Sequence, residues 1–150
     1  MVLVHLACRA PDAGDKYLAG DYQAGTVTLG NREDPGTRWE MNDLGNGQFT
    51  FLCMHELDPT DFFDHLASLN ETRYLDGNTA TGTVQLVKNT DPPFTGTRWL
   101  RSVLGDSLVF TCLGVSHGPR MLDGWPGPDS VQLRPHTDFL GTRWETVTPF

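Results

Sequence analysis

Two aspartates occupy equivalent places in the chain, and each is followed by glycine, in Leu75-Asp76-Gly77 and Leu122-Asp123-Gly124. A carboxylate at such a place can accept hydrogen bonds from the hydroxyl groups of a ligand. Trp125 directly follows the second pair, and an exposed indole offers an apolar face for stacking. Asp-Gly is also ordinary turn chemistry, because the aspartate side chain bonds nearby backbone amides. The residues therefore leave two interpretations open, a binding site and a pair of turns.

Residues that could catalyse a reaction or bind a metal ion form no recognisable motif. The chain contains no nucleophile-elbow, P-loop or His-Glu-x-x-His string. Its five histidines stand at no metal-ligand spacing, and nothing singles out a pair among its 19 acidic residues. We therefore expect a protein that is not an enzyme and that holds no cofactor or metal ion.

The two aspartates belong to an internal repeat that runs through the whole chain. Its most regular part is Gly-Thr-Arg-Trp, which occurs at residues 36–39, 96–99 and 141–144. Each copy follows a Tyr/Met-Leu-x-Gly segment and a Val-x-Leu segment. The cysteines stand at equivalent places ahead of these segments, as Cys8, Cys53 and Cys112. We place the three repeats at approximately 1–46, 47–105 and 106–150, within a single domain covering 1–150.

The composition describes a turn-rich globular chain and limits its partners. The 150 residues include 38% apolar residues, 16 Gly and 10 Pro, which favours one domain without long helices. A net charge of −8 repels phosphate backbones, so we expect no nucleic-acid partner. No segment approaches the roughly 18 apolar residues of a membrane span.

The cysteines and the first residues give an expectation for the compartment. Three is an odd number, and equivalent positions on separate strands argue against pairing, so buried reduced thiols are expected. Residues 1–18 contain neither the basic n-region nor the cleavage site of a signal peptide. Unpaired thiols suit a reducing compartment. We therefore expect a cytoplasmic protein, with secretion by a non-classical route left open.

The short apolar segments predict strands, because each is bounded by Gly, Asp or Asn. A unit of about 45 residues with four short strands buries too little apolar surface to be stable alone, so three units must share one core. The sequence therefore predicts an all-β protein with a β-trefoil fold, built from three four-stranded repeats with pseudo-threefold symmetry. The repeated tryptophans are expected to fill the core and the repeated arginines to face away from it. These are Trp39, Trp99 and Trp144, and Arg38, Arg98 and Arg143.

The second unit differs from the others by about 12 additional residues after Cys53. Asp58 followed by Pro59 is typical of a helix start. The apolar side chains that follow would share one face of a helix. We predict a short helical insert in the second repeat over Pro59–Leu69, which either caps the core or shapes a binding surface.

The order Tyr-Leu-Asp-Gly, Val-Gln-Leu and Gly-Thr-Arg-Trp resembles the ricin-type β-trefoil repeat of R-type lectins. In that repeat a Cys-Leu-Asp-like strand precedes Val-x-Leu-Trp and a closing Gln-x-Trp. The resemblance covers essentially the whole chain, in three copies. It implies a lectin that binds sugar through the aspartate, an aromatic residue just after Val-x-Leu, and polar groups just before the closing Trp. The carboxylate accepts from vicinal hydroxyls, and the aromatic face stacks on a pyranose ring.

The expected site residues match this chain in part. The aspartate matches at Asp76 and Asp123 but is Ala19 in the first unit, where Asp21 could substitute. The aromatic place after Val-x-Leu holds Gly30, Val87 and Arg134, and Gly-Thr replaces the polar pair before Trp. Trp125 offers a stacking platform from another direction, and Tyr22 stands one place further along in the first unit. The candidate ligand-binding residues are therefore Asp21, Tyr22, Asp76, Asn78, Asp123 and Trp125.

Two functions follow from these patterns. The leading hypothesis is a carbohydrate-binding protein of lectin type that recognises a glycan near Asp76 and Asp123. The alternative is a protein-binding module, such as a protease inhibitor or a cytoskeletal or toxin-complex interaction module, that acts through loops or the Pro59–Leu69 insert. The patterns select no particular sugar and no oligomeric state.

Overall fold

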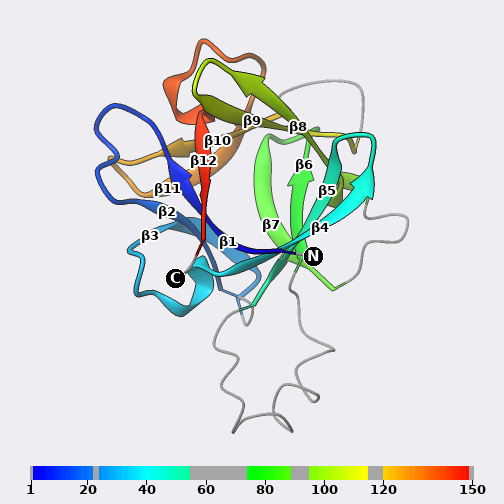
Figure 1. Ribbon diagram of the computed structural model, residues 1–150, viewed down its shortest axis with the longest axis horizontal. Helices are drawn as coiled ribbons and strands as arrows, with labels where there is room; N and C mark the ends of the chain where they lie inside the picture. The colour runs from blue at the N-terminus through cyan, green and yellow to red at the C-terminus, as the bar shows by residue number, and fades with distance from the viewer. Residues whose placement is uncertain (1, 22–23, 55–73, 89–94, 115–119, 149–150) are drawn as a thin grey trace, which may run out of the picture.

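The computed structural model describes residues 2–21, 24–54, 74–88, 95–114 and 120–148, and these residues form an all-β protein (Figure 1). The strands are β1 (Val2–Cys8), β2 (Tyr17–Asp21), β3 (Thr26–Gly30), β4 (Trp39–Gly45), β5 (Gln48–Cys53), β6 (Tyr74–Asn78), β7 (Thr83–Val87), β8 (Trp99–Leu104), β9 (Ser107–Cys112), β10 (Met121–Trp125), β11 (Ser130–Arg134) and β12 (Trp144–Val147). Short 3-10 turns precede three of them: η1 (Pro35–Thr37), η4 (Thr95–Thr97) and η5 (Leu140–Thr142). Within the described ranges, no helix is long and apolar enough to span a membrane.

Two sets of antiparallel pairings arrange the strands. The pairs β4–β5, β8–β9 and β1–β12 are linked by β1–β4, β5–β8 and β9–β12, so this succession of pairings returns to its start. The shorter hairpins β2–β3, β6–β7 and β10–β11 meet through pairings among β3, β7 and β11. Bridges such as Ala7 to Tyr17 and Leu52 to Tyr74 join the two sets into a 12-stranded sheet.

The predicted β-trefoil is therefore wrong. That prediction required three four-stranded repeats, whereas all the strands belong to one continuous antiparallel sheet. The physical reason is that backbone groups at the edges of each unit also bond to neighbouring units, so the four strands of a repeat are part of one larger sheet. The predicted helix over Pro59–Leu69 lies outside the described residues, whose only helical elements are the 3-10 turns.

The three closing tryptophans form the centre of the core, as predicted. All three side chains are fully buried, and each indole Nε1 donates to the carbonyl of a leucine on a short hairpin. The donors are Trp39, Trp99 and Trp144, which bond Leu18, Leu75 and Leu122 at 2.9, 3.1 and 2.9 Å. Burying each indole contributes about 2–3 kcal/mol, and the hydrogen bond removes the cost of a buried unpaired N–H. Arg38 and Arg98, one residue earlier, are exposed.

The glycine of each Gly-Thr-Arg-Trp string is required by a backbone contact. A Cβ at Gly36, Gly96 or Gly141 would overlap the carbonyl oxygen of Gly20, Gly77 or Gly124, which is the last residue of the Leu-x-Gly segment. A Cβ at those second glycines would in turn lie 2.8–3.0 Å from a cysteine Sγ. Two segments of each unit therefore approach with no room for a side chain between them.

The cysteines are buried thiols, which confirms the expectation for them. Each Sγ lies against the same glycine carbonyls: Cys112 donates to Gly77 and Gly96 at 3.5 Å, and Cys53 donates to Gly20 and Gly36 at 3.7 Å. Burial raises the pKa of the Cys8 and Cys112 thiols. These two thiols therefore stay protonated near neutral pH and act as small core side chains.

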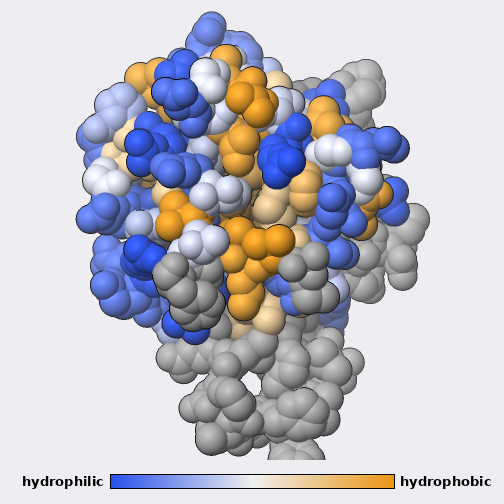
Figure 2. All heavy atoms as spheres, viewed as in Figure 1, coloured by the Kyte–Doolittle hydropathy of each residue, from blue (hydrophilic) through white to orange (hydrophobic). Residues whose placement is uncertain are grey.

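Apolar side chains also reach the surface at the ends of strands. Figure 2 shows apolar residues gathered toward the middle of the face viewed in Figure 1, with hydrophilic residues around them. Val103 is 74% exposed at the end of β8, and Leu44 is exposed near the β4–β5 turn. Val103 is a suitable control for substitutions of exposed apolar residues elsewhere.

The glycine contact predicts a large loss of stability for Gly96→Ala. A Cβ there would overlap the Gly77 carbonyl and lie 2.7 Å from Asp76 Oδ1, so the η4 turn and β6 must separate. We expect the free energy of unfolding, measured by urea denaturation, to fall by about 3 kcal/mol or more. Gly127→Ala is the control, because its nearest neighbour would be Trp125 Nε1 at 3.8 Å, an ordinary contact. Equal losses in the two variants would contradict this interpretation.

Candidate functional site

Asp76 and Asp123 lie on β6 and β10 and are almost fully buried, with 6% and 4% of their surface exposed. Each stands directly across its hairpin from a glutamine, in the pairs Asp76 with Gln85 and Asp123 with Gln132. Gln85 Nε2 donates to Asp76 Oδ2 at 2.9 Å, and Gln132 Nε2 donates to Asp123 Oδ2. The first unit has Ala19 across from Thr28 at this place. Two of the three hairpins therefore contain a buried aspartate that accepts a hydrogen bond from a glutamine across the hairpin.

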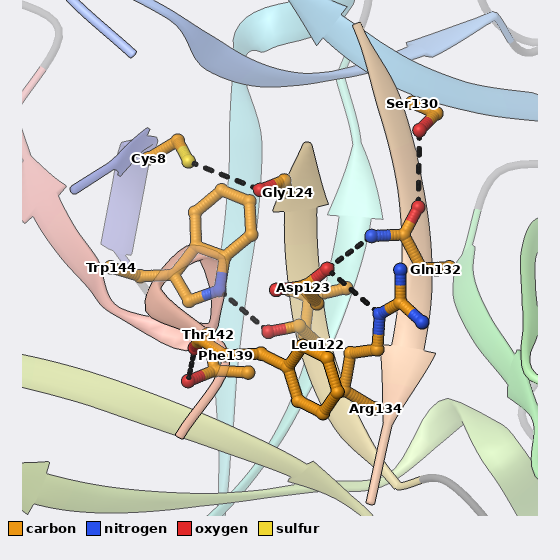
Figure 3. Close-up of polar contacts among 10 residues, drawn as sticks. All are labelled: Cys8, Leu122, Asp123, Gly124, Ser130, Gln132, Arg134, Phe139, Thr142 and Trp144. Atoms are coloured by element: carbon orange, nitrogen blue, oxygen red, sulfur yellow. Dashed lines mark hydrogen bonds and ion pairs between the residues drawn. The ribbon is translucent and has the colours of Figure 1, made fainter. Parts of the chain in front are cut away.

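Asp123 has an additional partner that Asp76 lacks (Figure 3). Arg134, at the end of β11, donates from Nε to Asp123 Oδ2 at 3.4 Å, and its guanidinium lies 4.8 Å over the ring of Phe139. The equivalent residue in the second unit is Val87, which cannot bond a carboxylate. The aspartate thus anchors a guanidinium only in the third of the described hairpins.

Burial dominates the protonation of both carboxyl groups. It raises the pKa of Asp76, and the hydrogen bond from Gln85 opposes the rise. It also raises the pKa of Asp123, against the opposing effects of Gln132 and Arg134. With so little exposed surface, the carboxylates hold neighbouring side chains in place more than they face a ligand directly.

A pocket of about 340 Å³ opens beside Asp123. Its lining comes from three segments of the chain: the turn after β1, the end of β10, and the segment from β11 to η5. Side chains that give it chemical character are those of Asp12, Asp123, Trp125, Arg134, Phe139 and Leu140. Trp125 is 55% exposed, and Phe139 and Leu140 are also exposed. The pocket therefore combines a large accessible aromatic surface with one guanidinium and two carboxylates.

Trp125 occupies a position whose side chain, in the other two hairpins, accepts hydrogen bonds from the backbone of the turn. Its equivalents are Asp21 and Asn78, since the three residues pair with Ser130, Thr26 and Thr83 respectively. Asp21 Oδ1 accepts from the backbone N–H of Ala24, and Asn78 Oδ1 accepts from those of Ala80 and Thr81. The third hairpin instead turns through Pro126 to Asp129, with Asp129 N bonded to the Pro126 carbonyl and φ of 55° at Asp129. The side chain of Trp125 therefore takes no part in this turn, and its indole is exposed to solvent.

The predicted site residues are therefore distributed over different places. Asp123 and Trp125 line the same pocket, whereas Asp76 and Asn78 lie on the β6–β7 hairpin and Asp21 lies at the end of β2. Tyr22 lies outside the described residues. Three groups that the sequence reasoning did not select, Gln132, Arg134 and Phe139, surround Asp123. The repeated Val-Gln-Leu segment, in which Gln stands opposite Asp in both hairpins, was a signal that could have identified Gln132.

A second pocket, of about 310 Å³, lies near the start of β2 and has a different character. Asp15, Asn31, Arg32 and Glu33 line it together with Tyr17, which is buried. It offers no exposed aromatic surface among these residues. Across the described ranges, no group of three or more His, Cys, Asp or Glu could hold a metal ion.

Comparisons with known proteins add a similarity of fold. No family model matches the chain, and no curated protein matches it. Among solved structures, the chain is similar to the GlcNAcα1-4Gal releasing endo-β-galactosidase from Clostridium perfringens, with a TM-score of 0.70 and 11% sequence identity. The match covers 99% of this chain and 33% of that one, so the chain spans about a third of the enzyme's length. At this identity the likeness concerns the fold alone.

The buried carboxyl of Asp76 predicts a pH dependence of stability. Because burial raises the pKa of Asp76 in the folded protein, the folded state takes up this proton at a higher pH than the unfolded state does. The Asp76 carboxyl therefore lowers the free energy of unfolding as the pH rises from about 4 through the raised pKa. The Asp76→Asn variant lacks this carboxyl, so it does not lose that part of its stability. We expect the difference, variant minus parent, to grow over that window by about 1.4 kcal/mol per unit of pKa elevation.

Urea denaturation across this pH range would measure the difference. Asp106→Asn is the matched control, since Asp106 is exposed in the β8–β9 turn and the change removes the same charge. A difference that stays constant or shrinks with rising pH for Asp76→Asn would contradict the assignment.

Proposed function

We propose that this protein binds a glycan, without catalysing a reaction, in the pocket beside Asp123. The observation that carries the proposal is Trp125, which is 55% exposed inside a concave site where the equivalent residues of the other hairpins cap turns. An indole that is exposed to water in a concave site is well suited to stack on the apolar face of a pyranose ring. The remaining lining supplies the polar groups that orient such a ring.

The polar groups of the pocket support this chemistry. Arg134 provides N–H donors, and Asp12 provides an exposed carboxylate acceptor at the turn after β1. Sugar hydroxyls both donate and accept, so a donor and an acceptor in one pocket match a pair of neighbouring hydroxyls. In this proposal Asp123 acts mainly by positioning Arg134, in contrast to the direct acceptor role that the ricin-type resemblance implies.

Two further points favour a carbohydrate over other ligand classes. The sequence motifs resemble those of ricin-type lectins, and the similar solved structure is that of an endo-β-galactosidase. Neither point identifies a sugar. The protein-binding alternative, acting through loops or the Pro59–Leu69 insert, stays a prediction, and the insert lies outside the described residues.

Replacing Trp125 tests the proposal. We expect the parent protein to retain one or more glycans on an array, and Trp125→Ala to weaken binding to them by at least about tenfold in calorimetric titration. The free energy of unfolding should change by less than about 1 kcal/mol, because the indole is largely exposed. Val103→Ala, at another exposed apolar residue, is the control and should bind as the parent does. Binding that survives Trp125→Ala, or an array without any bound glycan, would refute the proposal.

The differences among the three hairpins also predict the stoichiometry. Arg134 and Trp125 have no counterparts in the second hairpin, where Val87 and Asn78 stand, or in the first, where Gly30 and Asp21 stand. Titration should therefore give one bound glycan per chain, and Asp76→Ala should leave the affinity of the folded protein unchanged. A stoichiometry of two would show that the aspartate-glutamine pair is sufficient for binding, and a stoichiometry of three would show that it is not required.

A further inference from the structure

We infer that the glycan bound beside Asp123 is an uncharged saccharide, and that Asp12 and Arg134 set this specificity. The inference rests on the proposed function and adds the chemical class of the ligand. Three features of the pocket carry it: the charges of the lining side chains, the ion pair between Arg134 and Asp123, and the exposed ring of Trp125.

The charged side chains that line the pocket carry a net negative charge. Asp12, Asp123 and Arg134 are the charged side chains among its lining residues. Arg134 is paired with Asp123 at 3.4 Å, so the positive charge of the guanidinium is already balanced within the protein. Asp12 adds a second carboxylate to the pocket and is exposed, and the chain as a whole carries a net charge of −8. An acidic sugar would therefore meet a repulsive field in a site that contains an arginine.

The fixed orientation of Arg134 is the second step. Its guanidinium is held by the Asp123 carboxylate and by the Phe139 ring at 4.8 Å, and Gln132 bonds the same carboxylate oxygen. A guanidinium held in this way loses little further entropy when it donates to a ligand. Its Nε is used by Asp123, so the remaining N–H groups are available to donate to a hydroxyl oxygen of a ligand.

The aromatic surface is the third step. The Phe139 ring already packs against Arg134 and stacks on His136, with ring centroids 5.1 Å apart. Trp125 is the more exposed of the two aromatic side chains in the pocket, at 55% against 37%. A ring stacked on Trp125 would therefore present its hydroxyl edge to Asp12 and Arg134, and the exposed Asp12 would accept from a hydroxyl but repel a carboxylate.

Paired ligands that differ only in charge provide the experiment. Methyl pyranosides found to bind would be compared by calorimetric titration with the corresponding methyl uronosides, in which a carboxylate replaces the hydroxymethyl group. We expect the parent protein to bind the neutral member at least about tenfold more tightly. Asp12→Asn should reduce this ratio several-fold, and added salt should reduce it in the parent. Asp106→Asn, which removes an exposed carboxylate far along the chain in the β8–β9 turn, is the matched control and should leave the ratio unchanged.

Arg134 is tested by a second pair of variants. Arg134→Gln should weaken the neutral pyranoside by about tenfold. Arg101→Gln is its control, since Arg101 lies over Phe49 at 4.7 Å in a similar stacked pair outside the pocket. Three results would overturn the inference while leaving the glycan proposal standing. They are uronosides that bind as tightly as pyranosides, an affinity ratio that Asp12→Asn leaves unchanged, and full affinity for the pyranoside in Arg134→Gln. Failure of every pyranoside and uronoside to bind would overturn both.

Discussion

The structure depends on a backbone contact between two glycines in each unit. The glycine of Gly-Thr-Arg-Trp lies on the carbonyl of the glycine that ends the Leu-x-Gly segment, with no space for a Cβ. A cysteine Sγ and the ring of the closing tryptophan pack against the second glycine, and the indole N–H bonds the leucine carbonyl two residues before it. Because this arrangement occurs three times, a small chain obtains a dense core in which three large indoles have no unpaired polar group.

The same contact prepares the candidate site. In the second and third units an aspartate stands just before the second glycine and is buried, and its Oδ1 lies close to the closing-string glycine. In these two units the aspartate can then hold a glutamine across the hairpin, and in the third it also holds Arg134. The repeated framework is therefore rigid, and the chemistry comes from the few positions where the third unit departs from the others, mainly Trp125 and Arg134.

The fold prediction failed for a definable reason. The repeated segments predicted where strands, turns and core tryptophans occur, because these depend on neighbouring residues and on burial. The prediction arranged these strands as the three four-stranded repeats of a β-trefoil, whereas the strands of all three units pair into one 12-stranded sheet. Pairings such as Cys8 with Trp144 and Gln132 with Thr83 join different units, and they arise from backbone groups that have no distinct side-chain pattern. Asp76 and Asp123 were also expected to face a ligand, whereas both are buried and bonded.

By itself, the sequence determined the threefold repetition, the short strands, the buried thiols and the core role of the closing tryptophans, since each follows from residue type at a repeated spacing. The tertiary structure alone decided that one continuous sheet forms, and that Trp125, Arg134, Phe139 and Asp12 line one pocket beside Asp123. Asp12 lies more than one hundred residues from Asp123 along the chain. Such residues come together only when the first and third units pack, and nothing local in either segment encodes that contact.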